Sequence, residues 1–345
     1  MSSNQGRVLA KKLGTKGAFA LVIIALLAFF VLNKHTPIPL TDEARAWSQA
    51  IKTDGADKAY KDFQASVASL DQGTQHADAH SFGAALYSAK GIDAFPLCRD
   101  IFQYGCAHGF IATALQTEGM QVVAHFADVC RAQGYPGMCL HGIGHGLVSY
   151  LGYDDAALQK AVSACRDIAH DTSTAGCIGG SVMEFGQKTM AIQKDSRVMT
   201  PENSYEPCLS LAPDAKSACY FWNAGWWYTR LNYIESLTPE AAVKKMGQLC
   251  ASQKETEYIG ECFAGLGDIV AMASNYKGAE AVRMCDSASR DPSERLYCKA
   301  YAADIFLGDA RTRPDAFIVC NSLPSDEKNR CMYLAQMGVG VFDRK

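Results

Sequence analysis

The chain has 345 residues, of which 48% are hydrophobic and 20% are charged, and its formal net charge is −3. This hydrophobic fraction is sufficient for a packed core, and charges of both signs are interspersed, which gives no basis for binding nucleic acid. The length admits two average domains or one elongated domain.

The N-terminal region predicts a membrane anchor. An apolar run extends from Gly17 to Leu32, no acidic residue occurs before Asp42, and four basic residues precede the run: Arg7, Lys11, Lys12 and Lys16. Basic residues ahead of an apolar segment indicate a cytoplasmic N-terminus. The alternative is a cleaved signal peptide. The run is not followed by an A-x-A-like cleavage site or a lipobox cysteine, which favours an uncleaved signal anchor.

The domain boundaries follow from this interpretation. We expect a cytoplasmic tail over 1–16, a transmembrane helix over 17–33, an extended tether over 34–45, an N-terminal helical cap over 46–93 and a cysteine-stapled repeat domain over 94–345. The tether is predicted from Pro37 and Pro39. The expected localisation is a single-pass membrane protein whose C-terminal domain is periplasmic or at the cell surface.

The cysteines predict an architecture. All 14 lie beyond the apolar segment, and no C-x-x-C pair occurs, which argues against zinc-ribbon and c-type haem sites. In an oxidising compartment they would form disulfides. They fall into seven close pairs: Cys98–Cys106, Cys130–Cys139, Cys165–Cys177, Cys208–Cys219, Cys250–Cys262, Cys285–Cys298 and Cys320–Cys331.

Each pair belongs to a unit with the same pattern. An amphipathic stretch runs into the first cysteine, a polar loop follows, and the second cysteine opens another apolar-periodic stretch, as at residues 106–115. This pattern and the repeat period predict an all-α fold, an α-solenoid of about seven disulfide-stapled helical hairpins. Each disulfide would contribute about 2–3 kcal/mol by closing its loop.

This arrangement resembles the tetratricopeptide-like superfamily, in particular its secreted cysteine-rich relatives with one disulfide per helical repeat. The resemblance extends from about Ala94 to the C-terminus and rests on the period and the cysteine placement, since the W-L-G-Y consensus is absent. It implies a helical-hairpin architecture. Because those families mostly bind proteins or peptides, it also implies a binding scaffold.

Comparison among the units separates shared features from exceptional ones. The position three residues after the second cysteine is glycine in four units, Gly109, Gly142, Gly180 and Gly265, which predicts close contact between helices.

The position two residues after the second cysteine is histidine only in the first two units, as His108 and His141. His145 lies four residues after His141 and therefore shares its helix face. His108 should lie about 8–10 Å away on the adjacent helix. These three imidazoles are candidate ligands for a divalent metal, with zinc favoured. Polar packing between close helices is the alternative.

Glu184 is a lone acid in an apolar helix start of the third unit. We consider it as a metal ligand or a catalytic general base, and a buried hydrogen-bonding role as the alternative. Its position is rotated by about 100° from that of His145, which leaves their convergence open.

The fourth unit concentrates aromatic residues, with Trp222, Trp226 and Trp227 close together. Because Trp226 and Trp227 differ by about 100° on a helix, we expect that helix packing cannot hide all three. Buried core is the first interpretation and an exposed ligand-binding anchor is the second. Asp268 and Asp304 occupy the repeat position of His145, so a groove could run from histidines through aromatics to acids.

Two functions follow as hypotheses. The first is a membrane-anchored scaffold that binds a protein, peptide or glycan in a groove. The second is a metal-dependent enzyme or metal-binding protein that uses the histidines, and the sequence leaves the question of enzymatic activity open.

Overall fold

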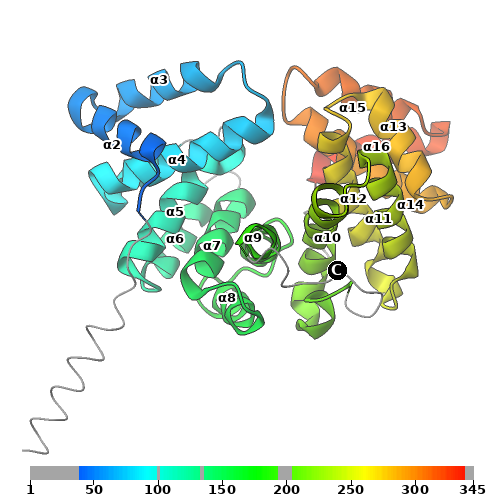
Figure 1. Ribbon diagram of the computed structural model, residues 1–345, viewed down its shortest axis with the longest axis horizontal. Helices are drawn as coiled ribbons and strands as arrows, with labels where there is room; N and C mark the ends of the chain where they lie inside the picture. Colours follow the sequence, from blue (N-terminus) through cyan, green and yellow to red (C-terminus); the bar gives the residue numbers. More distant parts are fainter. Residues whose placement is uncertain (1–38, 99–101, 133–135, 193–203, 339–345) are drawn as a thin grey trace, which may run out of the picture. The chain divides into compact units, whose positions relative to one another are not determined.

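The computed structural model describes residues 39–98, 102–132, 136–192 and 204–338, and all regular secondary structure in these ranges is helical (Figure 1). The predicted all-α class is therefore confirmed. The predicted cytoplasmic tail and transmembrane helix lie outside the described residues. Within those residues no helix is long and apolar enough to cross a bilayer.

The chain between the tether and the first cysteine forms three helices, α2 (Asp42–Asp54), α3 (Ala56–Val67) and α4 (Gln72–Lys90). Helix α2 begins at Asp42, where the side chain of Thr41 accepts a hydrogen bond from the backbone N–H of Ala44. The expected tether over 34–45 was therefore wrong in its last four residues, because Thr41 caps a helix there.

The second helix of each unit carries the second cysteine. These helices are α5 (Gly105–Glu118), α7 (Pro136–Leu151), α9 (Cys177–Ile192), α10 (Pro213–Tyr228), α12 (Ile259–Ala273), α14 (Pro292–Leu307) and α16 (Ser325–Met337). Five units have an α-helix before the first cysteine as well: α6 (Val122–Arg131), α8 (Asp155–Asp167), α11 (Pro239–Ser252), α13 (Gly278–Ala288) and α15 (Arg313–Asn321).

Two units depart from the predicted helical hairpin in the described residues around their first cysteine. In the first unit Cys98 follows the 3-10 helix η1 (Ile92–Leu97), which contains Pro96. Proline lacks a backbone N–H and disrupts an α-helix, so this segment remains a tighter turn. In the fourth unit Cys208 begins the 3-10 helix η3 (Cys208–Ser210). The short segments η2 (Phe102–Tyr104) and η5 (Thr256–Tyr258) are 3-10 turns, and η4 (Thr229–Ile234) is a π-helix that extends α10.

All seven cysteine pairs expected from the spacing are disulfides in the structure, and each closes the corner of its own unit. Their Cα atoms lie between 5.3 and 5.7 Å apart, within the usual range for disulfides.

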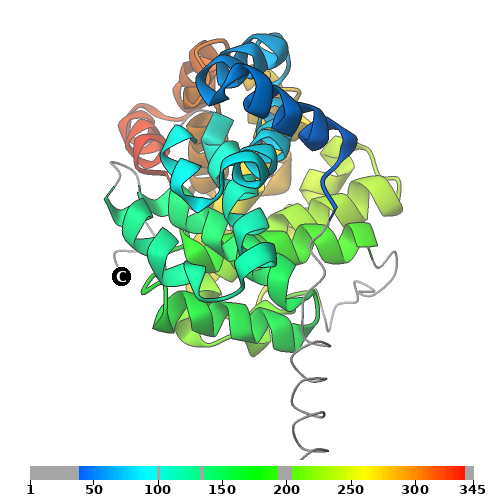
Figure 2. The same cartoon turned by 90° about the vertical axis from the view of Figure 1, so that its left-hand side faces the viewer.

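The second helices pack on one another in chain order. Helix α4 contacts α5, and the contacts continue through α7, α9, α10, α12 and α14 to α16. The turn between α3 and α4 contacts the later units, since Arg311 donates a hydrogen bond from Nη1 to the carbonyl of Leu70 at 3.1 Å (Figure 1 and Figure 2). The predicted N-terminal cap therefore touches both the first and the later units.

The predicted role of the shared glycines is confirmed. A Cβ atom placed on Gly109, Gly180 or Gly265 would lie 1.9–2.0 Å from a backbone carbonyl oxygen of the preceding second helix, or of α4 for Gly109. Gly267 lies in the same way against the carbonyl of Cys298, at 2.2 Å. Real Cβ atoms do not approach this closely, so these positions require glycine.

This packing predicts opposite effects for two glycines, one on α12 and one on α10. Gly267→Ala should lower the free energy of unfolding by about 1–3 kcal/mol or more, because the methyl group meets a backbone carbonyl that cannot move aside. In Gly225→Ala the new methyl group would meet, among the described residues, only the Ile269 side chain at 3.9 Å, and the variant should be neutral or stabilise by up to about 1 kcal/mol. Urea unfolding of both variants measures the difference, and equal stabilities would contradict the packing.

Candidate functional site

Five histidines gather where α4, α5 and α7 meet. The predicted residues His108, His141 and His145 have ring centroids 4.9–5.6 Å apart. They are joined by His76 and His80 of α4, whose rings lie 4.7 Å apart and within 5.4 Å of the His108 ring. His108, His141 and His145 are buried, whereas His76 and His80 are partly exposed.

Hydrogen bonds fix which ring nitrogen carries the proton in three of these histidines. His76 donates from Nδ1 to the carbonyl of Phe102, and His108 donates from Nε2 to the carbonyl of Met138, both at 2.9 Å. His145 bonds through Nδ1 to Glu184 Oε2 at 2.9 Å. On the opposite side of the His76 ring, Nε2 lies 3.0 Å from Nε2 of His80. His108 Nδ1 and His145 Nε2 are both buried without a hydrogen-bond partner in the described part of the chain.

Three nitrogens converge closely. One ring nitrogen of each of His76, His80 and His108 lies within 4.8 Å of the others. The Nε2 atoms of His76 and His80 are 3.0 Å apart. Ligands at a Zn–N distance of 2.0–2.1 Å in a tetrahedron are about 3.3 Å apart. The trio therefore approaches the spacing of a metal site with little rearrangement.

The surroundings favour neutral imidazoles. Burial, reinforced by the neighbouring histidines, holds the pKa of His108 and of His141 well below the usual value. Burial also lowers the pKa of His76, against the opposing effect of its bond to the Phe102 carbonyl. Neutral imidazole is the form that binds metals.

An unusual turn supplies the carbonyl that orients His76. Phe102, Gln103 and Tyr104 have φ values of 55°, 50° and 61°. Three consecutive non-glycine residues in the left-handed region are energetically unfavourable. This strained turn lies directly before α5 and places the Phe102 carbonyl on His76.

Glu184 converges with the histidines despite its offset on the helix. It is 8% exposed, and its Oε1 accepts a hydrogen bond from the hydroxyl of Tyr153 at 2.9 Å while Oε2 bonds to His145. Both oxygens are therefore engaged in orienting other groups. This geometry corresponds to the alternative of a buried hydrogen-bonding role rather than to a general base.

His141 lies between the histidine cluster and the aromatic residues. Its Nε2 is 3.4 Å from the sulfur of Met183, and its ring centroid is 4.9 Å from that of Trp222. It does not belong to the convergent trio. The predicted ligand set of His108, His141 and His145 therefore shares only His108 with that trio.

The tryptophans divide into core and cavity residues. Trp227 is fully buried and donates from Nε1 to the carbonyl of Ser204 at 2.7 Å. Trp226 is 3% exposed and Trp222 is half-buried. As expected, helix packing does not hide all three tryptophans, since Trp222 remains partly exposed. The adjacent Trp226 and Trp227 are both buried, because α9 and α12 both pack against α10.

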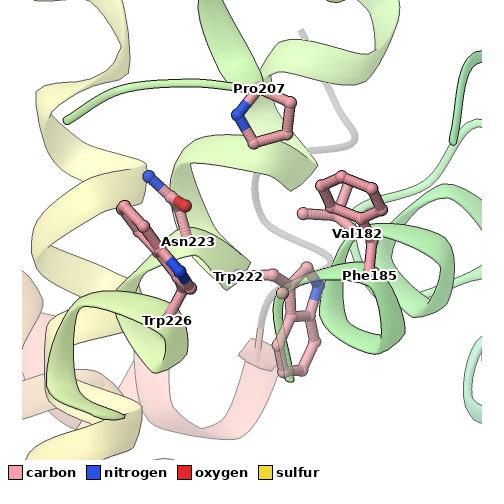
Figure 3. A pocket seen from close by; sticks show the side chains of 7 residues that line it. Val182, Phe185, Pro207, Trp222, Asn223 and Trp226 are labelled. Carbon is pink, nitrogen blue, oxygen red and sulfur yellow. The ribbon is translucent and has the colours of Figure 1, made fainter. Parts of the chain in front are cut away.

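Two small cavities border Trp222 and Trp226. The first, of about 10 Å³, lies among Trp222, Trp226, Asn223 and the side chains of α9 (Figure 3). The second, of about 50 Å³, also includes Asp268 of α12.

Burial raises the pKa of Asp268 to about 7. Asp304 on α14 also has its pKa raised to about 7, by burial and by the charge of Asp268. Neighbouring side chains thus follow the order expected from the sequence, from His141 through Trp222 to Asp268 and Asp304.

The sequence contained a signal for the missed histidines. His80 and Gly83 have the same H-x-x-G spacing as His141 and Gly144. The first pair lies ahead of the first cysteine, where the repeat of cysteines does not point to it. In both cases the glycine meets a cysteine carbonyl of the next second helix, at 2.0 and 2.1 Å. Helix α4 is therefore an additional second helix without a disulfide. Comparison with known protein families, curated proteins and solved structures found no match.

The raised pKa of Asp268 predicts a pH-dependent stability difference. The unfolded chain ionises this carboxyl near its ordinary value of 3.8, whereas the folded protein retains the proton to about pH 7. Stability is therefore lost as the pH rises between these values. Asp268→Asn removes this loss, so its melting temperature should exceed that of the parent at pH 8, by a smaller margin at pH 5.

The exposed Asp93 provides the control, since Asp93→Asn should show no gap that grows with pH. A constant or absent difference for Asp268→Asn between pH 5 and pH 8, measured by thermal unfolding, would refute the assignment.

Proposed function

We propose that the protein binds a divalent transition metal, with zinc favoured, through His76, His80 and His108, and that His145 is the fourth ligand. The observation that carries the proposal is the fixed orientation of three imidazoles. His76, His108 and His145 each hold one ring nitrogen on an oxygen acceptor. One ring nitrogen of His76 and one of His108 lie within 4.8 Å of a ring nitrogen of His80. Metal-ligating histidines almost always have such an acceptor on the distal nitrogen.

Binding is favoured over catalysis at this centre. Four imidazoles would close a tetrahedral zinc shell, whereas catalytic zinc retains an open position for water. Glu184 has both oxygens occupied by His145 and Tyr153 and is not poised as a base. Its role in the proposal is to orient His145.

The proposal includes the architecture and the compartment. We interpret the row of second helices as an α-solenoid that resembles the tetratricopeptide-like superfamily, and residues 17–33 as an uncleaved anchor. Seven disulfides support placement of the folded part in an oxidising compartment, in the periplasm or at the cell surface.

A second candidate function is a scaffold for a protein, peptide or glycan. The last hairpin supports it, because Phe317, Ile318 and Tyr333 are 49–52% exposed there. Exposed large apolar side chains gathered on one hairpin favour a protein partner there.

The metal proposal predicts that the purified full-length chain carries about one zinc ion and that added zinc raises its melting temperature. Binding at 100 times Kd would stabilise the fold by about 2.7 kcal/mol. His108→Ala should abolish both effects. Glu184→Gln, which keeps the side-chain size, should raise the zinc Kd by about 10–100-fold. Elemental analysis and calorimetric titration after chelation measure these effects.

His125→Ala is the matched control, because His125 lies on α6 with an exposed side chain and should leave zinc affinity unchanged. A parent protein without metal affinity, whose histidine variants only lose stability, would eliminate the metal proposal and leave the scaffold.

The anchor is tested separately. A reporter fused after residue 345 should be active only outside the cytoplasm, because the basic N-terminal residues resist translocation. The mature protein should retain residues 1–33, because no A-x-A-like cleavage site follows the apolar run. An N-terminus that begins after residue 25 would remove the anchor, and cytoplasmic reporter activity would reverse the orientation.

A further inference from the structure

We infer that the cavity between α9, α10 and α12 is a binding site for an alkylammonium group, with Asp268 as its counter-ion and Trp222 and Trp226 as its aromatic walls. This inference does not rest on the metal proposal. The cavity also contacts Met183 and Met272. Its volume of about 50 Å³ exceeds the roughly 10–15 Å³ that one water requires.

The single charged group of the cavity lacks a protein partner. Asp268 forms no hydrogen bond or ion pair with the described residues, and the nearby ionisable groups are Asp304 and Tyr276, neither of which is a cation. A carboxylate between aromatic and thioether side chains is poorly solvated. An organic cation would neutralise it and also interact with the indole faces.

The indole rings are held in place. Trp222 donates from Nε1 to the carbonyl of Thr174 at 2.8 Å, and it packs edge-on against Phe221 with ring centroids 4.9 Å apart. Trp226 is 97% buried, yet its Nε1 has no partner among the described residues. Because an ammonium group only donates hydrogen bonds, this donor would require a water beside the ligand as its acceptor.

Two glycines maintain the space without being required for packing. Gly186 and Gly225 line the cavity, and among the described residues a Cβ there would lie no closer than 3.6 and 3.9 Å to a neighbouring atom. Alanine would therefore be accommodated and would strengthen both helices. In contrast, Gly265 in the same wall meets a carbonyl at 1.9 Å. The open volume is thus present at some cost to helix stability, as expected for a binding site.

Calorimetric titration of the full-length chain at pH 8 tests the inference, since burial raises the pKa of Asp268 to about 7 and the carboxyl is ionised there. The probes are n-butylammonium and n-butanol, which have equal numbers of heavy atoms and differ in charge. We expect one n-butylammonium per chain, bound at least about tenfold more tightly than n-butanol. Equal affinities would overturn the inference.

Variants locate the site. Asp268→Asn and Gly225→Ala should each weaken n-butylammonium binding by about tenfold or more, through loss of charge and loss of volume. Both substitutions are expected to preserve folding. Asp93→Asn is the control, because Asp93 is exposed on η1, outside the cavity lining, and this variant should bind within about threefold of the parent. Unchanged binding in both Asp268→Asn and Gly225→Ala would overturn the inference.

Two further arms identify the source of the cation and separate the two proposals. Binding of Nα-acetyl-lysine amide at the affinity of n-butylammonium would indicate a lysine side chain, and exclusion of it would indicate a free amine.

The titrations are repeated with chelator and with zinc. Equal n-butylammonium affinity in both would show that the cavity functions irrespective of the metal proposal, whereas binding that disappears on chelation would contradict its independence.

Discussion

The close approach of successive second helices is the constraint on which the rest of the structure depends. At Gly109 and Gly180 the backbone of one helix lies against a carbonyl of its predecessor, with no room for a methyl group. These carbonyls belong to His80 and His141. The contact that brings the helices together therefore also places the histidines of neighbouring helices side by side. Larger residues at the glycine positions would separate the imidazoles as well as the helices.

The disulfides compensate for a weakness that this packing creates. Each glycine inside a helix costs about 0.8–1 kcal/mol relative to alanine, and several second helices contain two or more. A disulfide across a loop of the observed size contributes about 2–3 kcal/mol by restricting the unfolded chain. Each disulfide closes its own unit. Its stabilisation therefore acts in the same unit as the glycines that destabilise the second helix.

The candidate metal centre and the neighbouring cavity share a physical character. His108 Nδ1, His145 Nε2 and Trp226 Nε1 are buried polar atoms without partners in the described residues, and Asp268 is a carboxyl without a cation. Groups of this kind destabilise a folded protein unless a ligand satisfies them. These groups line the two neighbouring candidate sites, and this is the physical basis shared by the two proposals.

The sequence by itself determined the helical class, the cysteine pairing and the role of the shared glycines, because each depends on spacing within one unit or on its repetition. Only the tertiary structure decided the composition of the site. His76 and His80 come from a helix without cysteines, and Glu184 reaches His145 because adjacent helices approach closely enough to offset their rotation. Likewise, Trp226 and Trp227 point about 100° apart on one helix, and both are buried because neighbouring helices cover α10 from two sides. These outcomes depend on contacts between units, which local periodicity does not specify.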